Sequence, residues 1–136
     1  MKILVPIDGS DFSKKAAKVA LSIARHHKVE IILIHVIATT GQERKKWMEE
    51  GAEKLLNECK DALVGHGIEA INVTKIIENG DPAVCIVEAA ELKKVDRIII
   101  GTYGKTGLKK LTGSVTEKVL RKSKVLVMTV SPNYEI

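Results

Sequence analysis

Glycines and hydroxyl residues gather between positions 101 and 118, in the stretch GTYGKTGLKKLTGSVTEK. Gly101, Gly104 and Gly113 let backbone N–H groups approach phosphate oxygens closely, because no Cβ stands in the way. Successive N–H groups in such turns form concave anion sites. A helix expected from Ser114 would add its free N–H groups and the positive end of its dipole. The stretch predicts a phosphate-binding loop; the alternative is a crossover loop in which Ser114, with Glu117 at capping-box spacing, only caps its own helix.

The positive charge of the chain comes from the same region. Residues 1–100 contain 15 basic and 15 acidic residues, whereas residues 101–124 contain seven Lys or Arg against Glu117 alone. A local cationic field favours anions, and a solvated lysine face is the alternative interpretation of the charge. A nucleic acid would be another anionic partner. Aromatic residues for base stacking make up only 3% of the chain, which argues against nucleic acid.

Catalytic and metal-binding motifs are not found in the sequence. A Walker A loop needs a glycine five residues before Gly104, where Ile99 stands, and there is no G-x-G-x-x-G fingerprint. His35 lies in an apolar run, and Cys59 and Cys85 lie on helix-like stretches, so we interpret all three as core residues. No His/Cys cluster has ligand spacing, and no general acid–base pair stands out. We therefore expect a binding protein and not an enzyme.

Alternating apolar runs and helix-like segments must position the glycine-rich stretch. Strands are expected at 2–7, 29–37, 68–77, 95–100 and 124–130, and helices after Ser10, over 44–64, after Asp81 and from Ser114. This order predicts an α/β fold: one domain over residues 1–136, with a doubly wound five-stranded parallel sheet and helices on both faces. With strand order 3-2-1-4-5, the loops after Ile7 and Ile100 would face each other at the point where ligands bind such sheets.

Nothing in the sequence suggests export or a membrane. No apolar run nears the ~20 residues that a membrane span needs, and the N-terminus lacks the cleavage pattern of a signal peptide. The two cysteines form no CxxC motif and no disulfide framework. We therefore expect a cytoplasmic protein without a membrane partner.

Over essentially its whole length, the sequence resembles the universal stress protein family. The segments that carry the likeness are KILVPIDGSDFSKKAAKVAL, LIHVI, GDP at 80–82, VDRIIIGTYGKTGLKKLTGS and the closing apolar strand. The resemblance implies a homodimeric cytoplasmic α/β protein with strand order 3-2-1-4-5, which dimerises through the last strand, Val125 to Val130. It also implies a sensor or binding module that acts in the stress response.

The resemblance further implies a nucleotide site. One branch of the family binds ATP through a G-x2-G-x9-G-[ST] motif, and another branch lacks the motif and does not bind it. The implied ligand is ATP, or ADP or AMP, with Mg²⁺ or Mn²⁺ on the phosphates. The implied adenosine-side residues are Pro6, Ile7, Asp8 and Val36. The implied phosphate-side residues are Ile100, Gly101, Thr102, Gly104, Lys105, Gly113, Ser114 and Val115.

The sequence departs from this motif at one point. Eight residues, not nine, separate Gly104 from Gly113. One residue fewer moves a backbone N–H by up to ~3.5 Å in an extended chain, which is enough to break a hydrogen bond, although Gly107 and Gly113 are permissive. Three alternatives to an ATP-binding module stay open: the same fold acting through protein contacts without nucleotide, a nucleic-acid binder, and a slow ATPase.

Overall fold

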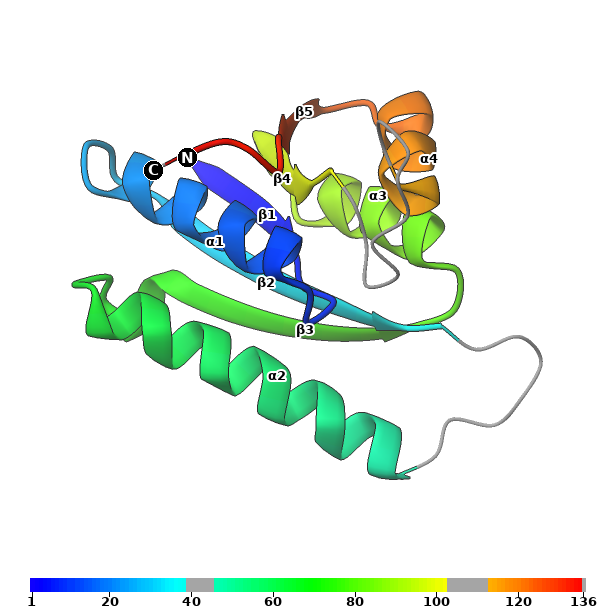
Figure 1. The fold of residues 1–136 in the computed structure, drawn as a ribbon, viewed down its shortest axis with the longest axis horizontal. Helices are drawn as coiled ribbons and strands as arrows, with labels where there is room; N and C mark the ends of the chain where they lie inside the picture. The colour runs from blue at the N-terminus through cyan, green and yellow to red at the C-terminus, as the bar shows by residue number, and fades with distance from the viewer. Residues whose placement is uncertain (39–45, 103–112, 136) are drawn as a thin grey trace.

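The computed structural model describes residues 1–38, 46–102 and 113–135, which contain a five-stranded parallel sheet (Figure 1). In chain order the elements are β1 Lys2–Pro6, α1 Asp11–Ala24, β2 Glu30–Ile37, α2 Lys46–Gly65, a 3-10 turn Ala70–Asn72, β3 Val73–Asn79, α3 Pro82–Leu92, β4 Arg97–Gly101, α4 Ser114–Lys122 and β5 Leu126–Val130. The strands are arranged β3-β2-β1-β4-β5, and every neighbouring pair is parallel. The predicted fold class and strand order are confirmed.

The sheet separates two hydrophobic clusters. Ile3 and Val5 of β1 face one cluster, which α1 and α2 cover, whereas Leu4 faces the other, which α3 and α4 cover. This split follows from the alternation of side chains along a strand. All three residues are fully buried, as expected for the central strand of a sheet that is covered on both faces. Crossovers to opposite faces require the strand order to reverse, and it reverses between β1 and β4.

Two helices begin as the sequence predicts. The Ser10 hydroxyl accepts a hydrogen bond from the Ser13 N–H at 3.2 Å, and Asp81 accepts one from the Val84 N–H at 3.0 Å. Pro82 occupies the first turn after Asp81, where its missing N–H costs nothing. Both N-caps are therefore confirmed, and Ser10 fixes the turn that leads from β1 into α1.

The start of α4 differs from the prediction. Gly113 is the N-cap, in an extended conformation and with no side-chain capping bond, and Ser114 is already the first helical residue. The capping box predicted for Ser114 and Glu117 is wrong, because Ser114 lies one position too late to cap. Glu117 instead accepts a hydrogen bond from Arg121, one turn later, at 2.5 Å. The Ser114 hydroxyl is thus not used by the helix cap.

The third strand begins later than the predicted range 68–77. Its first pairing joins Val73 to Ile31, and the partner strand β2 itself begins at Glu30. Ile71 and the residues before it would extend past the start of β2, and Ala70–Asn72 form the 3-10 turn, in which Ile71 is 85% exposed. The apolar residues of this segment resemble a strand in sequence, but the length of the neighbouring strand decides where pairing starts.

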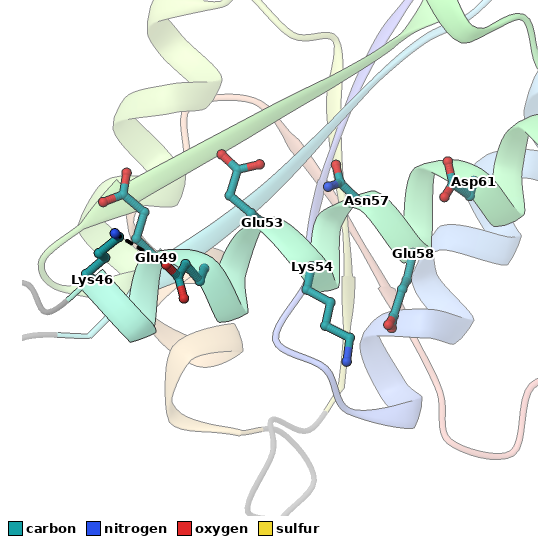
Figure 2. Close-up of a pocket in the computed structure, with 8 residues that line it drawn as sticks. Lys46, Glu49, Glu53, Lys54, Asn57, Glu58 and Asp61 are labelled. Carbon is teal, nitrogen blue, oxygen red and sulfur yellow. Dashed lines mark ion pairs between the residues drawn. The ribbon is translucent and has the colours of Figure 1, made fainter.

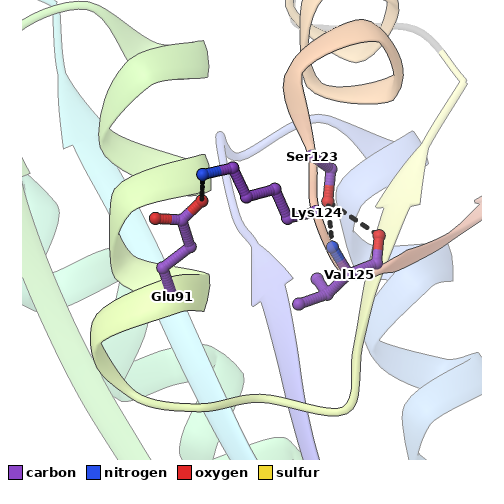
Figure 3. Close-up of polar contacts among 4 residues, drawn as sticks. All are labelled: Glu91, Ser123, Lys124 and Val125. Carbon is purple, nitrogen blue, oxygen red and sulfur yellow. Dashed lines mark hydrogen bonds and ion pairs between the residues drawn. The ribbon is translucent and has the colours of Figure 1, made fainter.

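The last strand also begins later than predicted, at Leu126 and not at Lys124 (Figure 3). The Ser123 hydroxyl accepts a hydrogen bond from the Val125 N–H at 3.1 Å and donates one to the Val125 carbonyl at 2.8 Å. Lys124 reaches across to Glu91 of α3, with 3.8 Å between Nζ and Oε1. These contacts turn the chain between α4 and β5. The strands β1, β2 and β4 agree with their predicted ranges to within two residues.

Candidate functional site

A cavity of about 830 Å³ lies at the carboxyl ends of β1, β2 and β4. Small-molecule sites occupy ~300–1,000 Å³. The cavity also lies beside the point where the strand order reverses, which is where doubly wound sheets bind ligands. Its remaining walls come from α2, from the start of α3 and from the first turn of α4. Topology and size both mark it as the candidate ligand site.

Most of the residues that the sequence implied for nucleotide binding line this cavity. They are Pro6, Ile7, Asp8, Val36, Ile100, Gly101, Gly113, Ser114 and Val115. Thr102 does not line it: this residue is buried, and its hydroxyl donates a hydrogen bond to the Val130 carbonyl of β5. Gly104 and Lys105 lie outside the described residues. The structure therefore brings the predicted adenosine side and the two ends of the predicted phosphate loop to one place.

Asp8 is held in the turn between β1 and α1. Its Oδ1 accepts hydrogen bonds from the Ser10 N–H at 2.9 Å and from the Ser10 hydroxyl at 2.5 Å. Gly9 follows with a φ of +88°, a conformation that favours glycine and lets the chain turn sharply. Among the described residues Oδ2 has no hydrogen-bond partner. A fixed carboxylate with one free oxygen in the cavity wall suits a hydroxyl donor on a ligand.

The first turn of α4 is tied to the end of β4 from both sides of the segment 103–112. The Gly113 N–H donates to the Thr102 carbonyl at 2.7 Å, and the Thr116 hydroxyl donates to the Gly101 carbonyl at 2.8 Å. Thr116 is only 3% exposed, so water competes little for this bond. The Thr102 hydroxyl extends the connection to Val130 of β5. The eight-residue spacing therefore still leaves the start of α4 at the end of β4.

The start of α4 presents polar groups that the helix does not use. The Glu117 N–H makes the first helical bond, to the Gly113 carbonyl at 3.0 Å. The N–H groups of Ser114, Val115 and Thr116 come before it and have no partner within the helix. The Ser114 hydroxyl has no partner among the residues that the structure describes. Free N–H groups, a hydroxyl and the positive end of the helix dipole together form a site suited to an anion.

Gly101 has a packing role that the sequence pattern did not indicate. A Cβ at this position would lie 2.7 Å from the carbonyl oxygen of Phe12 in α1, closer than real Cβ contacts occur. The glycine is therefore required where α1 crosses the end of β4. The sequence assigned Gly101 to the phosphate loop because it follows a strand and precedes another glycine; only the packing of two distant segments reveals the second requirement.

His35 lies in the cavity wall, which the sequence interpretation as a core residue missed. Its Nδ1 is 2.7 Å from the Ile7 carbonyl oxygen. Because a carbonyl oxygen only accepts, Nδ1 is the donor in this contact. Five residues of α2 also line the cavity and were missed, namely Trp47, Met48, Gly51, Ala52 and Leu55. The sequence signal that could have indicated this role is the presence of a glycine and the single tryptophan of the chain within one predicted helix.

A second depression, of about 560 Å³, lies along the outer face of α2 (Figure 2). The described residues that line it all belong to this helix, and nearly all of them are charged. Lys46 and Glu50 form an i,i+4 ion pair there, with 4.0 Å between Nζ and Oε1. Exposed pairs of this kind contribute little to stability. We interpret this surface as the solvated face of an amphipathic helix.

The two cysteines are poor nucleophiles. Burial raises the pKa of the Cys59 thiol to about 11, and the nearby Lys14 only partly opposes this. The pKa of Cys85 is also raised, first by burial and then by Glu78 and other neighbouring carboxylates. No group of three or more His, Cys, Asp or Glu that would suit a metal occurs within the described ranges. No helix in these ranges has the length and apolar character needed to cross a membrane.

Comparison with known proteins gives concordant matches. The model of the universal stress protein family matches residues 1–131. Universal stress protein MJ0531 of Methanocaldococcus jannaschii is 41% identical over 138 residues, which cover 95% of this chain and 81% of the relative. The solved structure of MJ0577, from the same organism, superposes with a TM-score of 0.78 at 36% identity and covers 98% of this chain and 97% of its own. A universal stress protein solved in complex with cAMP gives a TM-score of 0.78 at 26% identity, with 96% of each chain covered.

Proposed function

The chain belongs to the universal stress protein family, and on this premise we propose that it binds an adenine nucleotide, with ATP, ADP and AMP as the candidate ligands. We propose that it acts as a sensor or binding module in the stress response and not as a metabolic enzyme. One observation carries the proposal: Asp8, whose Oδ2 has no hydrogen-bond partner among the described residues, and the start of α4 line the same cavity. The similar protein solved with cAMP supports an adenine nucleotide as the ligand.

The two ends of the cavity suit the two ends of a nucleotide. Ile7 and Val36 supply apolar surface, and Asp8 supplies an acceptor for a ribose hydroxyl. Ser114 and Val115 would hold the phosphates through backbone N–H groups and the Ser114 hydroxyl. Because the described residues offer no metal-ligand cluster, Mg²⁺ or Mn²⁺ would be held mainly by phosphate oxygens, where it neutralises charge.

Equilibrium dialysis with labelled ATP, ADP, AMP and adenosine, with and without Mg²⁺, tests the proposal. We expect saturable binding at or below millimolar concentration. Trp47 is the only tryptophan of the chain and lines the cavity, so its fluorescence gives an independent titration. Absence of binding at millimolar ATP by both methods would reject the proposal and favour the same fold acting through protein contacts alone.

The variant Ser114→Ala separates phosphate binding from folding. Gly113, and not Ser114, caps α4, so we expect the free energy of unfolding to change by less than about 0.5 kcal/mol. Loss of one hydrogen bond to an anion should weaken ATP binding about tenfold and leave adenosine binding unchanged. Ser131→Ala, an exposed serine outside the cavity, is the matched control. Equal losses for ATP and adenosine would contradict this assignment.

Two other activities are tested directly. Phosphate release from ATP over hours measures slow hydrolysis, which we do not expect because the sequence shows no general acid–base pair. A gel shift at physiological salt measures binding to nucleic acid through the basic region.

We also propose that the protein is cytoplasmic, because Cys59 and Cys85 are free thiols. Cell fractionation tests this location.

We propose that the protein is a homodimer that pairs through β5. This strand lies at an edge of the sheet, and its residues Leu126 and Met128 are 72% and 37% exposed. Val127 between them packs against the cluster under α3 and α4. An apolar edge without proline or inward-pointing charge is prone to pair with another chain, and a second copy would cover the exposed side chains.

A further inference from the structure

The helix α2 brings a tryptophan and a glycine to the cavity, and the proposed phosphate site accounts for neither. Trp47 lies in the first turn of α2, lines the cavity and is 65% exposed. Gly51 lies one turn later and also lines the cavity. Residues four apart are neighbours on one face of a helix, so the two residues belong to a single surface.

Nothing in the described structure requires a glycine at position 51. A Cβ added there would meet no atom of the described residues within 4 Å, and the backbone is not in the left-handed region. Gly101 is the contrasting case, since Phe12 excludes a Cβ from that position. A glycine inside a helix destabilises it relative to alanine. The missing side chain of Gly51 leaves open space beside the helix backbone in the cavity wall.

The cavity has an anion-binding side and an apolar side. The start of α4 belongs to the layer on one face of the sheet, and α2 belongs to the layer on the opposite face (Figure 1). Met48, Ala52 and Leu55 of α2 extend the apolar wall. A ligand that spans the cavity therefore needs a negative end near α4 and a flat apolar end near α2. A purine nucleotide has this form.

From these observations we infer that Trp47 and Gly51 form the binding slot for the purine base. The indole ring of Trp47 stacks on one face of the base. Such stacking tolerates any base, because every base has an aromatic face. The missing side chain of Gly51 leaves room for the edge of the base beside the helix backbone. This inference rests on the proposed function and deepens it, because it names the residues of α2 that select an aromatic base over a bare phosphate chain.

A matched pair of glycine substitutions tests the slot. Gly51 and Gly65 both lie on α2, and a Cβ at either position meets no described atom within 4 Å, but only Gly51 lines the cavity. We expect Gly51→Ala and Gly51→Leu to weaken adenosine and ATP binding by about tenfold or more, with no loss of thermal stability. Gly65→Ala should bind both ligands within about twofold of the wild type. Binding of inorganic tripolyphosphate should be unchanged in all of these variants.

Trp47→Ala and Trp47→Phe test the stacking contact by the same assays. We expect Trp47→Ala to weaken adenosine binding by about tenfold and Trp47→Phe to retain most of the affinity.

The outcomes separate the base slot from the proposed function. If the wild type binds adenosine and ATP but the Gly51 and Trp47 variants bind them equally well, the slot is refuted and the proposed function stands. If the wild type binds neither ligand, both are refuted. If Trp47→Ala instead changes the oligomeric state and leaves nucleotide affinity intact, Trp47 serves a protein contact and the slot is again refuted.

Discussion

Gly101 shows how one residue can satisfy two constraints at the end of a strand. Its carbonyl accepts the Thr116 hydroxyl, its backbone lines the cavity, and its missing side chain makes room for Phe12 of α1. Of these roles, the close approach of Phe12 is the one that requires a glycine, because a Cβ would lie 2.7 Å from the Phe12 carbonyl oxygen. A substitution at Gly101 therefore affects the fold before it affects any ligand.

We expect Gly101→Ala to lower the free energy of unfolding by about 1–3 kcal/mol, because the added methyl overlaps the Phe12 carbonyl and forces α1 away from β4. Urea denaturation measures the change. Gly65→Ala, which adds the same methyl to open space, should change stability by less than about 0.5 kcal/mol. Equal stability of the two variants would contradict the packing role of Gly101.

Cys59 gives the protein a pH dependence that burial causes. The thiol of the unfolded chain ionises near its ordinary pKa of 9.0, whereas the pKa of the folded thiol is raised to about 11. This contribution to stability is fully present below pH 9 and is lost as the pH rises to about 11. The loss of stability is at most about 2.7 kcal/mol, and solvent screening at this partly exposed position makes it smaller.

The comparison of wild type with Cys59→Ala isolates this term, because lysines and tyrosines that titrate in the same range are common to both proteins. We expect the stability difference between the two, measured by urea denaturation at pH 8 and pH 11, to shift in favour of the variant at high pH. A difference that stays constant between these pH values would show that the Cys59 thiol ionises alike in the folded and unfolded chains.

At the scale of elements, the hydrogen bonds that hold α4 explain how a shortened loop keeps its two ends together. The Thr116 hydroxyl reaches Gly101, and the Gly113 N–H reaches the Thr102 carbonyl. Both bonds join residues outside the segment 103–112, and they hold the start of α4 at the end of β4. Thr116 is therefore a positioning residue for the proposed phosphate site.

We expect Thr116→Val to lower stability by about 1 kcal/mol, since it removes a buried hydrogen bond, and to reduce the preference for ATP over adenosine. Thr116→Ser keeps the hydroxyl and should restore that preference. The control Thr74→Val removes a hydroxyl from an exposed position on β3. It should leave the preference for ATP over adenosine unchanged. Isothermal titration with both ligands measures the ratio; an unchanged ratio in Thr116→Val would remove Thr116 from the positioning of phosphate.

At the scale of the whole molecule, the sheet has two edges of different character. β3 lies at one edge and β5 at the other. The residues of β3 that face solvent include Thr74, Lys75 and Glu78, and charge at an edge discourages pairing. β5 exposes Leu126 and Met128 instead. The chemistry of the two edges therefore favours β5 as the dimer contact.

We expect the wild type to be a dimer at tens of micromolar, and the double variant Leu126→Lys/Met128→Lys to be a monomer, because lysines on the edge strand repel a second copy. Light scattering and analytical ultracentrifugation measure the mass. Thr74→Lys on β3 adds charge to the opposite edge and should leave the dimer intact. A monomeric wild type would contradict pairing through β5.

The pattern of apolar runs was enough to predict a parallel α/β sheet with helices on both faces, because this follows from local periodicity and from the handedness of crossovers. The strand order was predicted from the resemblance to the universal stress protein family and not from the apolar pattern. Element ends were predicted less well. The start of β3 depends on where β2 begins, and the start of α4 depends on a capping glycine. Neither constraint is local to the residues that showed the strand or helix pattern.

By itself, the sequence determined the α/β architecture through its apolar periodicity and the family through its motifs. The family resemblance in turn implied that Asp8, Val36 and Ser114 would belong to one site. Only the tertiary structure decided that Thr102 serves β5 and not the cavity, that Gly101 must be a glycine because of Phe12, and that α2 contributes to the cavity. The physical reason is the same in each case. These roles depend on contacts between segments far apart in the chain, and such contacts leave no local pattern in the sequence.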